Sequence, residues 1–223
     1  MGYSPVNRFR TRRGRLLRRQ IERLADHLGR DLVVLDVGGR PDYWANVGLE
    51  RIARIDLVNY SAAELEREMA GAAASDVFRP RLGDARDLAD YGDGSVDLVH
   101  SNSVIEHVGG WGDMTAMADE MMRVGRAGWM QTPAWEFPVE PHFRAPFLHW
   151  FGAPLRARML SLSLQKRHRQ MDVHKRRRRV EMINLLSKSE VKALFPGKPL
   201  SVERVVFAKS YIVRWMPEGL ALP

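Results

Sequence analysis

Two histidines and a carboxylate in this chain have side chains suited to acid–base or metal chemistry. Glu106 and His107 are adjacent, and His142 lies in a segment rich in proline and aromatic residues. Two imidazoles and a carboxylate can bind a divalent cation such as Mg²⁺, or an imidazole can act as a general base that a partner orients. The sequence leaves both roles open, so these three residues are predicted as catalytic residues and as metal ligands.

A second group of small and acidic residues follows four predicted strands. These residues lie in four short segments, at 36–39, 56–59, 83–85 and 101–103. In a parallel sheet with helices on both faces, a ligand binds at the carboxyl ends of the strands. We therefore expect the four segments to meet at one edge of a sheet, around a bound molecule.

The elements that position these segments alternate between strands and helices. Continuous apolar runs predict buried strands, and helical periodicity predicts helices. The predicted strands are 32–37, 51–57, 81–85, 95–102, 127–133, 200–206 and 210–215, and the predicted helices are 8–29, 61–74, 113–125 and much of 155–195. This alternation is typical of an α/β, Rossmann-like, doubly wound fold. We expect a mostly parallel seven-stranded sheet, an antiparallel C-terminal edge hairpin and a cap inserted after the fifth strand.

The composition bounds the domain organisation and excludes several kinds of site. The chain has 223 residues, of which 45% are hydrophobic and none is cysteine. This favours one domain over residues 1–223, with a core at 31–133, a cap at 134–195 and C-terminal strands at 200–215. Disulfides, cysteine-ligated zinc, iron–sulfur clusters and a cysteine nucleophile are excluded. No apolar run is long enough for a membrane span. We expect a cytoplasmic protein, and the oligomeric state stays open, with a homodimer as one option.

The strand-end segments resemble those of class I S-adenosylmethionine-dependent methyltransferases, in the type 11-like, O-methyltransferase branch. Asp36 and Gly38 match the first motif of that family, and residues 97–108 closely match its signature at the fourth strand. Residues 123–133 match the approach to the fifth strand. The resemblance covers residues 31–135 well and extends more loosely to Val213. It implies S-adenosylmethionine as the cofactor and methyl transfer as the reaction.

The resemblance also implies which residues contact the cofactor. In the family, an acidic residue closing the second strand binds the ribose hydroxyls, an Asp near the third strand pairs with the adenine amine, and the loop after the fourth strand lies beside the methionine part. The residues at the family's cofactor positions are Asp36, Gly38, Gly39, Asp56, Leu57, Asp84, Ala85, Ser101 and Asn102. The chain departs from the pattern at Arg40 and Asp42, where the second and third glycines are usual, so the loop after the first strand is predicted to follow an altered path.

The histidines favour an oxygen acceptor, because a hydroxyl has a pKa far above 7 and needs a base or a metal to lose its proton. We expect a small acceptor, with a saccharide or glycosylated metabolite as the first choice. The segment resembles small-RNA 2′-O-methyltransferases and ubiquinone-pathway O-methyltransferases, which carry Glu-x-x-Glu-His and use a metal to hold the acceptor oxygen. Here Ser103 replaces the first Glu. Trp135, Glu140 and Phe143 are predicted to contact the acceptor.

Two basic segments leave alternatives open. Residues 8–23 and 166–179 hold 16 of the 35 Lys and Arg residues in a chain with a net charge of +8. They are either solvated helix faces or surfaces that attract an anionic acceptor. An RNA 2′-O-methyltransferase is therefore one alternative, with nucleic acid as a less favoured partner. A methyltransferase-like binding protein without activity is another, because the glycine loop is altered.

Overall fold

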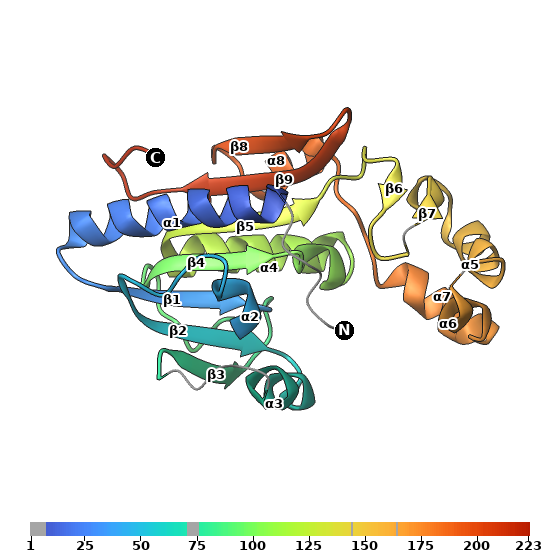
Figure 1. Cartoon of the computed structure of the whole chain (residues 1–223), viewed down its shortest axis with the longest axis horizontal. Helices are drawn as coiled ribbons and strands as arrows, with labels where there is room; N and C mark the ends of the chain where they lie inside the picture. Colours follow the sequence, from blue (N-terminus) through green and yellow to red (C-terminus); the bar gives the residue numbers. More distant parts are fainter. Residues whose placement is uncertain (1–7, 71–75, 144, 164) are drawn as a thin grey trace.

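The fold is built on one large, mostly parallel sheet. The computed structural model describes residues 8–70, 76–143, 145–163 and 165–223. Within these residues a seven-stranded sheet has the order β3-β2-β1-β4-β5-β9-β8 (Figure 1). Its strands are β1 (Leu32–Val37), β2 (Ile52–Asn59), β3 (Phe78–Leu82), β4 (Val96–Asn102), β5 (Gly125–Pro133), β8 (Leu200–Arg204) and β9 (Ala208–Trp215). β1 to β5 are parallel, whereas β9 runs antiparallel to both of its neighbours. The predicted fold class, with its C-terminal edge hairpin, is confirmed.

Helices cover both faces of the sheet, as its central strands, buried on both faces, require. α1 (Arg8–Leu28) packs in one apolar cluster, and α4 (Trp111–Val124) packs with α8 (Lys188–Leu194) in another. Alternate residues of β1 belong to the two clusters, because successive side chains of a strand point to opposite faces. Buried Gln20 of α1 donates hydrogen bonds to the carbonyls of Gly128 and Trp215, which fixes the helix against β5 and β9.

Three short elements lie at the carboxyl edge of the sheet. They are α2 (Pro41–Trp44) after β1, α3 (Ala62–Ala70) after β2, and the 3₁₀ turn η1 (Ile105–His107) after β4. The predicted helix over 61–74 is confirmed as far as Ala70, and its remaining positions lie outside the described residues. The third strand comes earlier in the chain than the predicted 81–85 and leaves Gly83 in the following loop.

The cap forms a small separate layer beyond the carboxyl ends of the parallel strands (Figure 1). It consists of β6 (Val139–Glu140), β7 (Ala145–Pro146), η2 (Leu148–Trp150), α5 (Ala153–Ser161), α6 (Lys166–Arg169) and α7 (Val173–Glu181). Its own apolar cluster includes Phe143, Leu160 and Val180. Residues 188–195 were expected in the cap, but they pack in the main core, because Val191, with Leu194 and Phe195, joins the cluster under α4.

Among the described residues, no helix combines the length and apolar character that a membrane crossing requires.

Candidate active site

A cavity of about 690 Å³ opens at the carboxyl ends of the parallel strands. It is lined by Gly38 after β1, Asn59 at the end of β2, Asp84 and Ala85 after β3, and Ser103 after β4. This is the edge where ligands of doubly wound sheets bind, and the volume lies within the ~300–1,000 Å³ range of small-molecule sites. The predicted meeting of the four segments is therefore realised, although by a partly different set of side chains.

Gly38 turns the chain at the edge of this cavity and has no room for a side chain. Its φ is +69°, a left-handed conformation that favours glycine. Its N–H donates to the carbonyl of Val58 over 2.8 Å, which ties the turn to β2. A Cβ at this position would lie 2.6 Å from Cγ2 of Val104. The turn thus leaves only backbone facing the cavity.

Asp36 does not line the cavity, and its buried carboxylate packs against the loop after β1. Its side chain is fully buried, with one oxygen 2.6 Å from Nδ1 of His100 and the other accepting a 2.8 Å hydrogen bond from Nε1 of Trp44. A Cβ on Gly39 would overlap this carboxylate, since it would lie 1.9 Å from Oδ2. The displaced glycine of the first motif is therefore explained by a loop that passes directly over the buried carboxylate.

Three further residues predicted to contact the cofactor lie outside the cavity. Leu57 is buried in the apolar cluster under α1, and the buried hydroxyl of Ser101 donates to the carbonyl of Val37. Asn102 lines a separate small cavity, where its side-chain oxygen accepts a 3.4 Å hydrogen bond from Arg13. These side chains hold strand and helix together and do not reach the large cavity.

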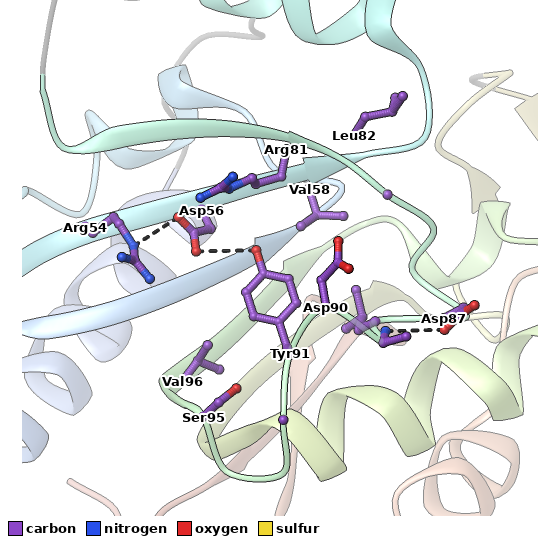
Figure 2. A pocket seen from close by; sticks show the side chains of 14 residues that line it. Arg54, Asp56, Val58, Arg81, Leu82, Asp87, Asp90, Tyr91, Ser95 and Val96 are labelled. Atoms are coloured by element: carbon purple, nitrogen blue, oxygen red, sulfur yellow. Dashed lines mark hydrogen bonds and ion pairs between the residues drawn. The ribbon is translucent and has the colours of Figure 1, made fainter.

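Asp56 also lies outside the cavity, in the second pocket shown in Figure 2. It is almost fully buried, pairs with Nε of Arg54 over 3.1 Å and accepts a hydrogen bond from the hydroxyl of Tyr91. Burial and the charge of Asp56 raise the pKa of Tyr91 to about 12. The strand continues three residues beyond Asp56, so Asn59 occupies the strand end that the sequence analysis gave to Asp56.

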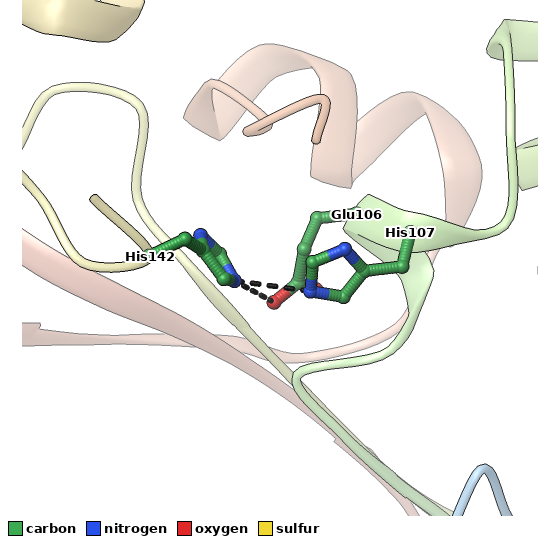
Figure 3. Close-up of side chains that lie close together, drawn as sticks. All are labelled: Glu106, His107 and His142. Atoms are coloured by element: carbon green, nitrogen blue, oxygen red, sulfur yellow. Dashed lines mark hydrogen bonds and ion pairs between the residues drawn. The ribbon is translucent and has the colours of Figure 1, made fainter. Parts of the chain in front are cut away.

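Glu106, His107 and His142 lie close together, as Figure 3 shows. The two histidines line the cavity where it meets the cap, and Glu106 is buried next to them. The Nε2 atoms of the two histidines are 3.0 Å apart, and Nε2 of His142 lies 3.9 Å from Oε1 of Glu106. One ligand atom from each of the three residues lies within 4.8 Å of the others. Residues 35 positions apart in the chain are brought together because the cap folds over η1.

The outer nitrogens of both rings are already held by the protein. Nδ1 of His107 donates to the carbonyl of Met182 over 3.2 Å, and Nδ1 of His142 lies 2.6 Å from a carboxylate oxygen of Glu140. Each ring therefore turns its Nε2 toward the same point. Two lone pairs that face each other at 3.0 Å repel unless a proton or a cation lies between them. The protein atoms around the ring lower the pKa of His107, and the charge of His142 acts in the same direction.

Glu106 is fully buried, and only one of its two carboxylate oxygens accepts a hydrogen bond. Oε2 accepts a 2.9 Å hydrogen bond from the hydroxyl of Thr132, whereas Oε1 has no hydrogen-bond partner among the described residues. Burial raises the pKa of Glu106 to about 7, although Thr132 and the charge of His142 oppose the shift. A buried carboxylate oxygen without a partner is costly, and it points to a group that the site is built to receive.

The residues predicted to contact the acceptor have other roles in the structure. Phe143 is buried in the apolar cluster of the cap, and Glu140 is buried, where it orients His142 and accepts from the backbone N–H of Phe143. Trp135 lines a different cavity, and its carbonyl binds His149. Ser103, at the position of the missing Glu, donates to the side chain of Gln131. The cavity wall is completed by Arg179 and Met182 of the cap, which the sequence analysis did not single out.

Comparison with known proteins decides the family. A family model described as a methyltransferase domain matches residues 9–195. The chain belongs to this family. It is an S-adenosylmethionine-dependent methyltransferase of class I, as the strand-end motifs predicted. No curated protein shows significant sequence similarity to it.

Solved structures of other methyltransferases share the fold. A putative methyltransferase from Haloferax volcanii, solved in complex with the Trm112 methyltransferase activator, has a TM-score of 0.54 and 16% identity over 92% of this chain and 90% of that one. Magnesium protoporphyrin IX methyltransferase from Synechocystis PCC 6803, with bound SAH, has a TM-score of 0.52 and 12% identity over 96% and 89%. At such identities the likeness concerns the fold alone.

Proposed function

We propose that this methyltransferase transfers the methyl group of S-adenosylmethionine to a hydroxyl group of a small acceptor. The observation that carries the proposal is that His107 and His142 line the same cavity as the Gly38 turn and the end of β2. Glu106 has a ligand atom within 4.8 Å of theirs. A cofactor that lies along the strand ends would place its methyl group toward the cap. The histidine–carboxylate cluster would then face the incoming acceptor oxygen.

For the cofactor, the proposal assigns contacts to the strand-end residues that line the cavity. Gly38 lets the backbone approach the methionine part, Asn59 takes the ribose hydroxyls, and Ala85 with Asp84 borders the adenine. Asp84 is held by Arg86, whose Nη2 lies 2.6 Å from Oδ2 and which also pairs with Asp113. The hydrogen bond from Arg86 lowers the pKa of Asp84, so the carboxylate is ionised at neutral pH.

Because the ribose contact is assigned here to Asn59 and not to Asp56, variants of these two residues give a first prediction. We expect Asp56→Asn to leave the affinity for S-adenosylhomocysteine within about twofold, while Asn59→Ala lowers it about 3–10-fold through lost hydrogen bonds. Isothermal titration calorimetry measures both affinities, and thermal unfolding checks that each variant is folded. A tenfold loss in a folded Asp56→Asn protein would return the ribose contact to Asp56.

The residues of the cluster fit a divalent cation. Both histidines have their outer nitrogens fixed by a carbonyl or a carboxylate, which is the usual arrangement around metal-binding histidines. The unpartnered oxygen of Glu106 supplies a third donor on the same side. Two nitrogen donors suit a first-row transition metal better than Mg²⁺, which prefers oxygen ligands. When bound, such a cation would act as a Lewis acid toward the acceptor hydroxyl.

The chain's own residues position the reactants. Glu140 orients His142 and the Met182 carbonyl orients His107, so neither ring needs to reorganise during the reaction. Methyl transfer to oxygen requires the acceptor in line with the methyl group and removal of one proton. Without a cation, an Nε2 atom would accept that proton, whereas a cation held by the two Nε2 atoms would instead make the hydroxyl easier to deprotonate. A small saccharide is the first acceptor class to test.

Methyl transfer with a labelled cofactor tests the proposal. The protein is incubated with S-adenosylmethionine labelled on the methyl group and with a panel of small hydroxylated acceptors, before and after removal of divalent cations. We expect transfer to oxygen, located by mass spectrometry, that is lost on metal removal and restored by Mn²⁺ or Zn²⁺. Transfer to nitrogen or carbon would overturn the proposal. Transfer that survives metal removal would assign the histidines as a base, and steeply salt-dependent transfer to RNA would support the RNA alternative.

A further inference from the structure

Four arginines line the active-site cavity, and three of them are neutralised by carboxylates. Arg40 pairs with Glu68 over 2.8 Å, Arg67 pairs with Glu64 over 3.5 Å, and Arg86 pairs with Asp84 and Asp113. Their carboxylate partners lie on α3, in the loop after β3 and in the first turn of α4. The side chain of the fourth, Arg179, has no hydrogen bond or ion pair with any residue that the structure describes.

Arg179 differs from the other basic residues of its helix. Lys175 pairs with Asp172, Arg177 pairs with Glu181, and Arg178 is exposed to solvent. Arg176 is partly buried, but it donates to the carbonyl of Met171 over 2.9 Å. Arg179 is also partly buried, and it borders the cavity together with Met182, whose carbonyl holds His107. One cation of α7 is thus turned toward the reaction centre.

A partly desolvated guanidinium without a carboxylate lacks the compensation that buried charges normally have. Arginine stays protonated, and its planar fork matches the two oxygens of a phosphate or a carboxylate. The neighbouring histidines offer no negative charge, and a cation at their Nε2 atoms would add to the positive potential. An anionic group on the acceptor would supply the missing partner.

We propose that the acceptor carries an oxyanion group, a phosphate or a carboxylate, which Arg179 binds while the hydroxyl to be methylated faces His107 and His142. This inference rests on the proposed function, because it takes the cap end of the cavity as the acceptor site. It specifies the substrate class as an anionic hydroxylated molecule, such as a sugar phosphate or a sugar acid. The carboxylate of the cofactor is assigned to the Gly38 turn, where Arg40 borders the same cavity.

The test measures anion binding and does not depend on turnover. The protein is stripped of metal on a chelating resin and loaded with S-adenosylhomocysteine, and inorganic phosphate and acetate are titrated separately at low ionic strength. The variants are Arg179→Gln and, as a matched control from the same helix, Arg178→Gln. We expect the wild type and Arg178→Gln to bind at least one of the two anions, and Arg179→Gln to bind it about tenfold or more weakly. Phosphate or acetate preference identifies the kind of oxyanion.

The outcomes separate this inference from the proposed function. S-adenosylhomocysteine should bind Arg179→Gln with an affinity within twofold of the wild type. A large loss of that affinity would assign Arg179 to the cofactor carboxylate and overturn the inference while leaving methyl transfer intact. Anion binding that is absent, or equal in the two variants, would also overturn it. Failure of the wild type to bind S-adenosylhomocysteine would instead contradict the proposed function.

Discussion

Replacing His142 with alanine should lower the affinity of the protein for Mn²⁺ or Zn²⁺ at least about 100-fold, since loss of outer partners alone costs about 10–100-fold. The variant removes one of the two nitrogen donors, so that only Glu106 and His107 remain as ligands. Titration calorimetry of the metal-stripped protein measures the affinity. Methyl transfer to any accepted substrate should fall with it.

Two further variants make this first expectation specific. His174→Ala removes an exposed histidine of α7 outside the cavity and should bind the cation like the wild type. Glu140→Gln keeps the ligands but weakens the hydrogen bond that orients His142, so we expect an intermediate loss of about 10–100-fold. Unchanged cation affinity in a folded His142→Ala protein would contradict a cation site at Glu106, His107 and His142.

Exchange of Gly38 for alanine should weaken binding of S-adenosylhomocysteine at least about tenfold, because a change of about 1.4 kcal/mol is enough for that factor. The new Cβ would meet Val104 at 2.6 Å and would sit on a backbone with a φ of +69°. The turn must move, and it moves at the edge of the cavity. Calorimetric titration of the variant with S-adenosylhomocysteine measures the effect.

Gly29 provides the matched control for this exchange. It has nearly the same backbone conformation, with a φ of +66°, but nothing lies within 4 Å of its added Cβ. Gly29→Ala should therefore cost about 1–2 kcal/mol of stability from the left-handed strain and leave S-adenosylhomocysteine binding unchanged. Equal binding losses in the two variants would mean that general destabilisation explains the effect of Gly38→Ala.

The sheet could be predicted from the sequence because its signals are local. The apolar run of β1 and the Asp-Leu-Val segment of β4 show strands that are buried on both faces. The order of the strand-end motifs then fixed the family. The extent of β2 was less accessible, since nothing local shows that Val58 pairs with Val37 and prolongs the strand past Asp56. That pairing extends the strand from its predicted end at Leu57 to Asn59.

The cluster of Glu106, His107 and His142 could also be predicted, because the chemistry of these side chains is plain in the sequence. What holds them could not. The partner of His107 is a carbonyl 75 residues away, and it is placed by the packing of the cap. For the same reason Phe143 became part of the cap's apolar cluster, and Arg179 became part of the cavity wall. Long-range packing of a cap on a sheet leaves no periodic signal.

The burial of Asp36 shows a different limit of sequence reasoning. A carboxylate after the first strand matched the family motif, but in this chain His100 and Trp44 take up both of its oxygens. The altered glycine pattern was the visible sign of this arrangement, because Gly39 is needed where the loop crosses the carboxylate. The motif therefore indicated the right loop, while the side chain serves to support it.

A crystal structure of the protein with S-adenosylhomocysteine and Zn²⁺, with anomalous data at the zinc edge, would show directly whether the cofactor and a cation occupy the proposed sites. We expect one anomalous peak bonded to Oε1 of Glu106 and to Nε2 of His107 and His142. We also expect the nucleoside at Asn59 and Ala85 in the adjoining cavity. A cavity that holds S-adenosylhomocysteine but gives no peak at the three residues, or a cofactor bound in the pocket of Asp56, would contradict this expectation.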